Sequence, residues 1–143
     1  MNLETSLIDF DRVYKAIENL SNIQSDKVIQ QGLKDASNIF INAGKSNLRD
    51  RLKGTGKGNL LKAFRTKLKR TKLGALSGFE KNGSHAHLID MGTEERFNKK
   101  GQYRGKVIGN HFWTDAISQN QTQAIERIYS GIERGIINIL SKY

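Results

Sequence analysis

The sequence predicts an α+β protein in which two N-terminal helices, a basic β-hairpin or small antiparallel sheet, and a long C-terminal helix pack together. Three observations predict this class. Apolar residues recur at helical spacing near both ends of the chain, within residues 4–43 and 114–142. Between them, residues 63–80 include a run with the period of two that strands show. The length of 143 residues suits a single domain, 1–143, with a modest core.

The first two helices are expected to form an antiparallel pair. The first covers about residues 4–21, and its apolar side carries Leu7, Phe10, Tyr14, Ile17 and Leu20. The sequence SNIQSD, residues 21–26, interrupts the pattern, and Ser25 or Asp26 can cap the second helix. The second helix is expected to end at Gly44, because glycine is common just past helix C-termini.

The middle of the chain is expected to be a flexible loop followed by the hairpin. Residues 45–58 include KGTGKG, which combines three glycines with positive charge. A helical turn at NLLKAF then leads into a strand near 63–69, and a second strand is expected over 73–80. The turn between these strands is basic.

A short helix and a loop follow the hairpin. SHAHLIDMG, residues 84–92, is expected to form a helix with Ser84 as its cap and Gly92 as its end. Residues 93–110 are polar and punctuated by glycine, so we expect a loop with a brief extended piece at 104–108.

One long helix is expected over residues 114–142. Its apolar stripe recurs at helical spacing and consists of Ile117, Ala124, Ile128, Ile132, Ile136 and Ile139. Gly131 and Gly135 lie four residues apart, so another backbone could approach this helix closely there.

The positive charge is concentrated in one segment. The chain has a formal net charge of +10, and residues 45–72 alone hold 11 basic and one acidic side chain. Such a field attracts phosphate backbones or acidic protein surfaces. If residues 65–72 are extended, Arg65, Lys67 and Lys69 share one face, where they could bind successive phosphates of a nucleic-acid backbone. The docking or DNA-facing residues expected in this segment are Lys53, Lys57, Lys62, Arg65, Lys67, Lys69, Arg70 and Lys72.

The composition excludes several classes of protein. The chain has no cysteine, so disulfides and Cys-ligated metals are excluded. No run of 18 apolar residues is present, so a membrane-spanning helix is not expected. The N-terminal MNLETSLIDF carries acids where a secretion signal needs basic residues, so a signal peptide is not expected either.

No catalytic residues, metal or cofactor are expected. AGKS lacks the upstream glycine that a phosphate-binding loop requires. His85, His87 and Asp90 could ligate a metal, but the remaining histidine, His111, lies in a different segment, which favours polar surface histidines. The chain has no cysteine and no serine on a nucleophile elbow, so no nucleophile for covalent catalysis is expected. An enzyme is therefore not expected.

The stretch HLIDMGTEERF is expected to be a structural corner that positions the loop and the last helix. Gly92 is expected to have a positive φ that ends the short helix. Thr93 is expected to close the turn through its hydroxyl. Asp90 would either accept hydrogen bonds from backbone N–H groups or pair with a basic side chain of the hairpin or of a neighbour.

Three short motifs, in this order of elements, carry a family resemblance. A Gly-x-Leu step leads into the hairpin, an acid-x-Gly-Thr motif follows HAHLI, and HFWTDAI starts the last helix. The matching residues are Gly58, Leu60, Ala86, Ile89, Asp90, Gly92, Thr93, Phe112 and Ala116. The chain resembles the tail-completion or neck family of long-tailed bacteriophages, small head–tail joining proteins also described as minor tail components. Asp90 replaces the family's Glu, His85 replaces its Tyr, and its two prolines are missing, so the last helix must begin differently.

The resemblance implies a structural phage or prophage protein and not an enzyme. Copies would form a ring, a hexamer in the virion, docked between the head connector or head-closure protein and the tail tube. Residues 45–72 would supply the docking or lumen-facing element, and the C-terminal helix the packing between subunits. DNA in the channel is a further partner, no membrane is involved, and the protein would be made in the bacterial cytoplasm. The charge alone leaves an alternative open, a protein that binds nucleic-acid backbones through residues 45–72.

Overall fold

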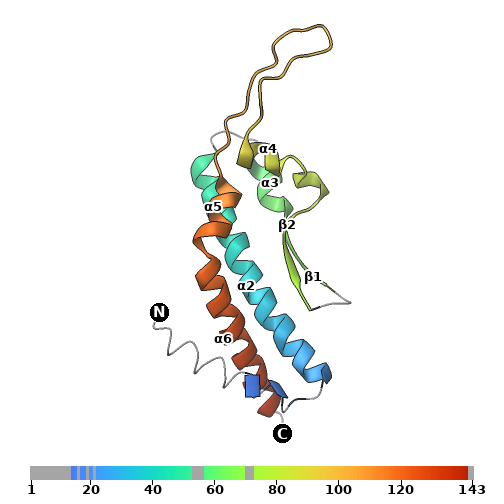
Figure 1. Cartoon of the computed structure of the whole chain (residues 1–143), viewed down its shortest axis with the longest axis vertical. Helices are drawn as coiled ribbons and strands as arrows, with labels where there is room; N and C mark the ends of the chain where they lie inside the picture. Colours follow the sequence, from blue (N-terminus) through green and yellow to red (C-terminus); the bar gives the residue numbers. More distant parts are fainter. Residues whose placement is uncertain are drawn as a thin grey trace. The chain divides into compact units, whose positions relative to one another are not determined.

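The computed structural model describes residues 14, 15, 17, 18, 20, 22–52, 57–69 and 73–141. They form an α+β fold, as the sequence predicted (Figure 1). In chain order the elements are α2 (Asn22–Arg51), α3 (Lys57–Ala63), β1 (Phe64–Leu68), β2 (Ala75–Phe79), the short 3-10 helix η1 (Lys81–Gly83), α4 (Ala86–Met91), α5 (Phe112–Gln119) and α6 (Gln121–Leu140). No helix among the described residues is long and apolar enough to cross a membrane.

The chain divides into two compact units, each with its own apolar core. The first contains residues up to Ile39, Thr66–Leu76 and the chain from Gln121 onward. The second contains Phe40–Arg65 and Ser77–Asn120. Helix α2 therefore contributes its N-terminal part to one core and its C-terminal part to the other.

Most of the first expected helix, residues 4–21, lies outside the described residues. Tyr14, Lys15, Ile17 and Glu18 are described and helical. Ile17 and Leu20 pack against the core of the first unit, as their helical spacing predicted.

Helix α2 begins earlier than predicted and also ends later. It starts at Asn22, so Ser25 and Asp26 lie inside the helix and neither is its cap. Ser25 instead donates its hydroxyl to the carbonyl oxygen of Ile17 at 3.4 Å. The flexible loop expected over 45–58 is wrong for residues 45–51, which continue α2, and for 57–58, which begin α3. The glycine-rich residues 53–56 lie outside the described part.

Gly44 is buried in the middle of α2 and does not end the helix. A Cβ on Gly44 would lie 2.7 Å from the Trp113 ring and 2.8 Å from the Phe64 ring. The position thus needs a glycine because two aromatic side chains pack directly on the helix backbone, and this packing outweighs the low helix propensity of glycine. Gly44 looks like the C-terminal stop of a helix in the sequence, but the glycine is needed because Trp113 and Phe64 pack on it.

The first unit is held together by the close approach of α2 and α6 (Figure 1). A Cβ on Gly131 would lie 2.7 Å from the Cα of Gly32, and a Cβ on Gly135 would lie 2.8 Å from Val28. The predicted close approach at Gly131 and Gly135 is therefore present, with the partner backbone supplied by α2 of the same chain. The buried core beside it consists of Val28, Ile132 and Ile136.

The C-terminal helix is interrupted, although the sequence predicted one helix over 114–142. Helix α5 ends at Gln119 and α6 begins at Gln121, with Asn120 between them at φ −115° and ψ 11°. The Asn120 side-chain amide donates to the carbonyl oxygen of Ala116 at 2.9 Å, so it satisfies an acceptor that the broken helix leaves open. The apolar stripe predicted for the second part is confirmed, since Ala124, Ile132 and Ile136 are buried.

The predicted hairpin is present as the antiparallel pair β1–β2. The backbone N–H of Lys69 donates to the carbonyl oxygen of Gly74 at 2.9 Å, next to the turn. Along β1, Phe64 is buried while Arg65 and Lys67 are exposed, which is the alternation expected of a strand. Residues 70–72, with Arg70 and Lys72, lie outside the described part.

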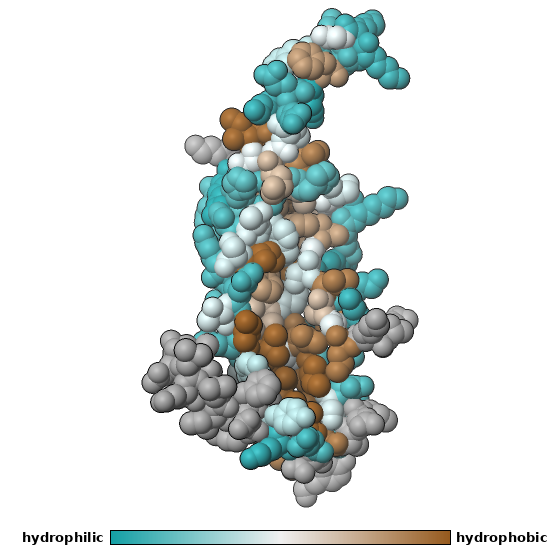
Figure 2. Space-filling model, viewed as in Figure 1, coloured by the Kyte–Doolittle hydropathy of each residue, from teal (hydrophilic) through white to brown (hydrophobic). Residues whose placement is uncertain are grey.

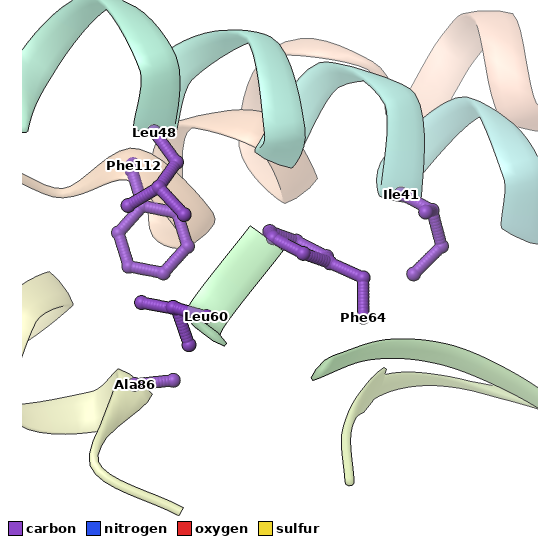
Figure 3. Packing of buried hydrophobic residues seen from close by; sticks show 6 residues of the cluster. All are labelled: Ile41, Leu48, Leu60, Phe64, Ala86 and Phe112. Carbon is purple, nitrogen blue, oxygen red and sulfur yellow. The ribbon is translucent and has the colours of Figure 1, made fainter. Parts of the chain in front are cut away.

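The core of the second unit gathers side chains from five elements (Figure 3). Phe112, Leu48 and Leu60 are its largest fully buried side chains. The Phe64 ring lies 4.6 Å from the Phe79 ring and 5.8 Å from the Trp113 ring, centroid to centroid. Aromatic packing of this kind fixes α5 against the base of the hairpin.

Candidate functional site

The acid-x-Gly-Thr motif lies in the second unit, where α4 ends, a long two-stranded loop leaves, and α5 begins. We call residues 90–93 and 109–114 the corner, and the loop of residues 93–108 the arm. Both belong to the same compact unit, so their geometry relative to each other is defined. In Figure 1 the arm extends away from the ends of α4 and α5.

Asp90 is a buried carboxylate, 6% exposed, that caps helix α5. Its Oδ1 accepts the backbone N–H groups of Trp113 at 2.8 Å and of Thr114 at 3.0 Å. Its Oδ2 accepts the Thr114 hydroxyl at 2.6 Å. A negative charge with these partners satisfies the open donors of a helix N-terminus and interacts favourably with its dipole. The hydrogen bonds predicted from backbone N–H groups are confirmed.

No basic side chain among the described residues of this chain pairs with Asp90, whereas pairing with a basic residue of a neighbour stays a prediction. The ion pairs among the described residues join Arg51 to Asp115, Arg65 to Glu80 and Arg134 to Asp35. Both carboxylate oxygens of Asp90 are already occupied by α5. A group held in this way stabilises a helix and is poorly placed to transfer a proton.

Gly92 has φ +81° and ends α4, as predicted. Its N–H donates to the carbonyl oxygen of Leu88 at 2.9 Å. A Cβ here would lie 2.6 Å from the backbone nitrogen of Gly109 and 2.7 Å from the carbonyl oxygen of Val107. The position therefore needs glycine for two reasons, backbone conformation and space. The predicted cap at the other end of α4 is wrong by one residue, because the N-cap is His85 and not Ser84.

Thr93 uses its hydroxyl differently from the prediction. The hydroxyl accepts the backbone N–H of Val107 at 3.0 Å, and the Thr93 N–H donates to the Val107 carbonyl oxygen at 2.9 Å. Both bonds cross from one side of the arm to the other, and neither closes the local turn. Thr93 thus ties the two sides of the arm together at its base.

Two side chains of α2 hold the corner in place, and sequence reasoning missed both. The Arg51 Nη1 donates to the carbonyl oxygens of Asn110 at 2.9 Å and His111 at 3.1 Å, and to Asp115 at 2.5 Å. The Asn47 side-chain amide donates to the carbonyl oxygen of Phe112 at 3.0 Å. The sequence placed Asn47 and Arg51 in a loop, because Gly44 was expected to end the helix.

His111 and Gly109 are the other corner residues that the sequence did not reveal. His111 is the one described non-glycine residue with a positive φ, 54°. A Cβ on Gly109 would lie 2.5 Å from the backbone of Met91, so the two sides of the arm touch backbone to backbone at its base. The signal that could have revealed this corner is the pair GN directly before HFW, since Gly and Asn favour a turn where a helix is about to begin.

The remaining motif residues lie in the core of the second unit. Leu60, Ala86 and Phe112 belong to one buried cluster (Figure 3). Ile89 packs against this cluster. Ala116 is buried on α5 with no exposed surface. The exposed Gly58 on α3 is the exception, since a Cβ there would meet nothing within 4 Å. Most of the motif thus specifies packing between α3, α4 and α5.

The arm is an irregular two-stranded ribbon, where the sequence predicted a loop with one extended piece at 104–108. Antiparallel bridges join Gly92 to Ile108 and Phe97 to Tyr103. The Phe97 and Tyr103 rings lie 5.7 Å apart, centroid to centroid. Both are more than half exposed, so the arm ends in an uncovered aromatic pair.

The described residues of the basic segment 45–72 lie mainly in α2, α3 and β1. Arg51 is used in the corner, Arg65 pairs with Glu80, and the Lys45 ammonium lies 5.9 Å from the Phe64 ring centroid. The exposed cations with no ion pair among the described residues are Arg49, Lys62, Lys67 and Lys69. Lys57 is the first residue of α3, and Lys53 lies outside the described part.

His85, His87 and Asp90 do not form a metal-binding group. The part of the chain that the structure describes contains no cluster of three or more His, Cys, Asp or Glu side chains able to hold a metal ion. The His87 ring Nδ1 lies 2.8 Å from the carbonyl oxygen of Ser84, which is a local contact within one turn. Comparisons of the chain with protein-family models, with curated proteins and with solved structures found no match.

Proposed function

We propose that this chain is a structural protein of the head–tail junction of a long-tailed phage or prophage, a tail-completion or neck subunit. It would assemble as a ring, a hexamer in the virion, between the head connector or head-closure protein and the tail tube. One observation supports this most directly. The acid-x-Gly-Thr motif that carries the resemblance builds the fold, since Asp90 caps α5 and Gly92 allows the arm to leave α4.

The chemistry of the corner also favours a structural protein over an enzyme. Asp90 is buried, and three donors from α5 occupy its two oxygens. Motif residues from α3, α4 and α5 meet in one core. Sequence motifs of enzymes usually surround an accessible reactive group, whereas this motif specifies how three helices and an arm are joined.

The contacts between subunits would use the side of α6 that faces away from α2. Gly131 and Gly135 already pack against α2, so they are not free for a neighbour. Ile125, Ile137 and Leu140 are each at least half exposed on the same helix. Contact with a neighbouring subunit would remove these side chains from water.

An in-frame deletion of the gene from a phage that carries it tests the proposal. Electron microscopy of the lysate should show filled heads and separate tails, and infectivity should be lost. If tails still join heads and the particles remain infectious, the proposal is wrong. The size of the pure protein in solution is a weaker test, because such subunits can stay monomeric until they meet a neighbouring ring.

A second candidate is a protein that binds nucleic-acid backbones through residues 45–72. It is favoured by the exposed Lys62, Lys67 and Lys69, which have no ion pair among the described residues. Replacing these three lysines with glutamine should then weaken DNA binding and reduce its salt dependence. Unchanged binding by the triple variant would exclude the segment as the contact.

A further inference from the structure

We propose that the arm, residues 93–108, contacts the phosphate backbone of duplex DNA through Arg96, Lys99, Lys100, Arg104 and Lys106. The sequence places the main positive charge elsewhere, in residues 45–72. The structure adds that a second run of cations, within residues 96–106, lies on one two-stranded ribbon. The inference does not rest on the proposed function, because it concerns the isolated protein and free DNA.

The distal part of the arm carries positive charge alone. Residues 96–106 contain five basic side chains and no acidic one, and all five are exposed. None of them forms an ion pair with another residue of the described chain. The arm is also mostly hydrophilic in Figure 2, at the top of the view. The two acids of the arm, Glu94 and Glu95, come before this run, so residues 93–108 as a whole carry five basic and two acidic side chains. A projecting element with this excess of cations produces a local field that attracts a polyanion.

The backbone register brings two of these cations together. The Arg104 N–H donates to the Arg96 carbonyl oxygen at 2.6 Å, beside the Phe97–Tyr103 bridge. The Arg96 N–H donates to the carbonyl oxygen of Gly105 at 3.1 Å, so Arg104 and Gly105 together oppose Arg96. Because side chains alternate along extended chains, we infer that each arginine lies on the face away from its aromatic neighbour, Phe97 or Tyr103. Like charges facing each other across a strand pair are destabilising. A phosphate bound between them would remove this repulsion.

The arm is held in shape before any partner binds. Asn98 organises the tip, because its Oδ1 accepts the backbone N–H groups of Lys100 at 2.9 Å and Gln102 at 2.8 Å. Thr93 and Val107 tie the base with two hydrogen bonds. A pre-ordered ribbon loses less conformational entropy when it binds. A two-stranded ribbon also matches the width of the DNA major groove, about 12 Å.

The aromatic pair favours duplex over single-stranded DNA as the partner. Proteins that hold single strands stack bases on aromatic rings along the same track that binds the phosphates. Here Phe97 and Tyr103 pack on each other, at 62° between ring planes. By the alternation of side chains along the ribbon, we infer that the rings lie on the other face from the arginines. A strand held by Arg96 and Arg104 could not stack on them at the same time. A second copy of this chain is a less suitable partner for the basic arm, since the whole chain carries a net charge of +10.

The test measures binding of the full chain to a labelled 30-base-pair duplex by fluorescence anisotropy over a range of salt concentrations. The arm variant changes Arg96, Lys99, Lys100 and Arg104 to glutamine. Its matched control changes four exposed cations elsewhere to glutamine, namely Lys27, Lys34, Lys81 and Arg127. Both variants lose the same charge, so a general effect of net charge appears equally in each.

The arm variant should bind the duplex at least tenfold more weakly than the control at low salt. Its slope of log affinity against log salt should fall by about 3 to 4, since each phosphate contact contributes about 0.9. Equal affinity and slope for the two variants would overturn the proposal, as would a wild-type protein that does not bind duplex at micromolar concentration and low salt. Preference for a single strand, lost in Phe97→Ala, would overturn the choice of duplex. None of these failures would affect head–tail joining, which the deletion tests separately.

Discussion

Asp90 contributes to stability through three hydrogen bonds to α5. Its oxygens receive two backbone N–H groups and one hydroxyl of α5, and the carboxylate is buried. Removing it leaves donors of the first turn of α5 without an acceptor. The energetic cost then combines the loss of a helix cap with the burial of unsatisfied polar groups.

We expect Asp90→Ala to lower the free energy of unfolding by about 2 kcal/mol or more. Urea unfolding followed by circular dichroism measures this change. The control is Asp50→Asn, which neutralises an exposed carboxylate near the C-terminal end of α2 and should change stability little. Equal effects of the two substitutions would show that Asp90 is not a cap.

A glycine can be required because its backbone has a positive φ or because a Cβ would collide with a neighbour, and Gly92 and Gly101 allow these two causes to be measured separately. Both have positive φ, 81° and 76°, but only at Gly92 would a Cβ collide with the backbone. We expect Gly101→Ala to cost about 1–2 kcal/mol, from conformation alone. Gly92→Ala should cost roughly 3 kcal/mol, because the collision with Gly109 and Val107 adds to the strain. Similar unfolding midpoints for the two variants would contradict the close contact at the base of the arm.

At the scale of residues, the sequence was informative where the cause is local. The positive φ of Gly92 follows from short-range chemistry and was predicted. The bonding of Asp90 to backbone N–H groups was predicted as one of two alternatives, but its partners Trp113 and Thr114, 23 and 24 residues away, were not. Thr93 was predicted to bond locally, but its partner Val107 lies 14 residues away. Arg51 and its partner Asp115 are 64 residues apart, and no short-range pattern links them.

At the scale of elements, α2 and α6 approach so closely that glycine is required on both. A Cβ on Gly131 would lie 2.7 Å from the Cα of Gly32. Elsewhere in a helix, alanine is better than glycine, because glycine loses more conformational entropy on folding. The sign of a Gly→Ala change therefore reports whether two helices touch.

We expect Gly131→Ala to destabilise the protein by about 1–3 kcal/mol, because the helices must move apart. The matched substitution is Gly58→Ala in α3, where a Cβ would meet nothing within 4 Å. It should stabilise the protein by about 0.5 kcal/mol. Thermal and urea unfolding of both variants give the two signs, and a stabilising Gly131→Ala would contradict the packing of α2 on α6.

The hairpin, α3 and α4 could be predicted because their signals are confined to a few adjacent residues. The ends of α2 and the division of the last helix could not, since each depends on tertiary contacts. Gly44 resembles a helix stop in sequence, yet Trp113 and Phe64 pack on it and the helix continues. The seven-residue spacing of Ile41 and Leu48, both buried, was the signal that the helix passes Gly44.

At the scale of the whole molecule, the described residues form two compact units, each with its own apolar core. The exposed apolar residues of α6 belong to one compact unit, and the arm and corner to the other. Under the proposed function, α6 would pack between neighbouring subunits and the arm would meet DNA in the channel.

The most direct measurement of head–tail joining is complementation with purified protein. A lysate of the deletion phage should contain unjoined heads and tails. Adding purified wild-type chain should restore plaque-forming particles and, by electron microscopy, joined heads and tails. The Gly92→Val variant should restore far fewer, because the corner cannot close around a side chain. Joined, infectious particles without any added protein, or none after adding folded wild-type protein, would contradict a role in joining heads to tails.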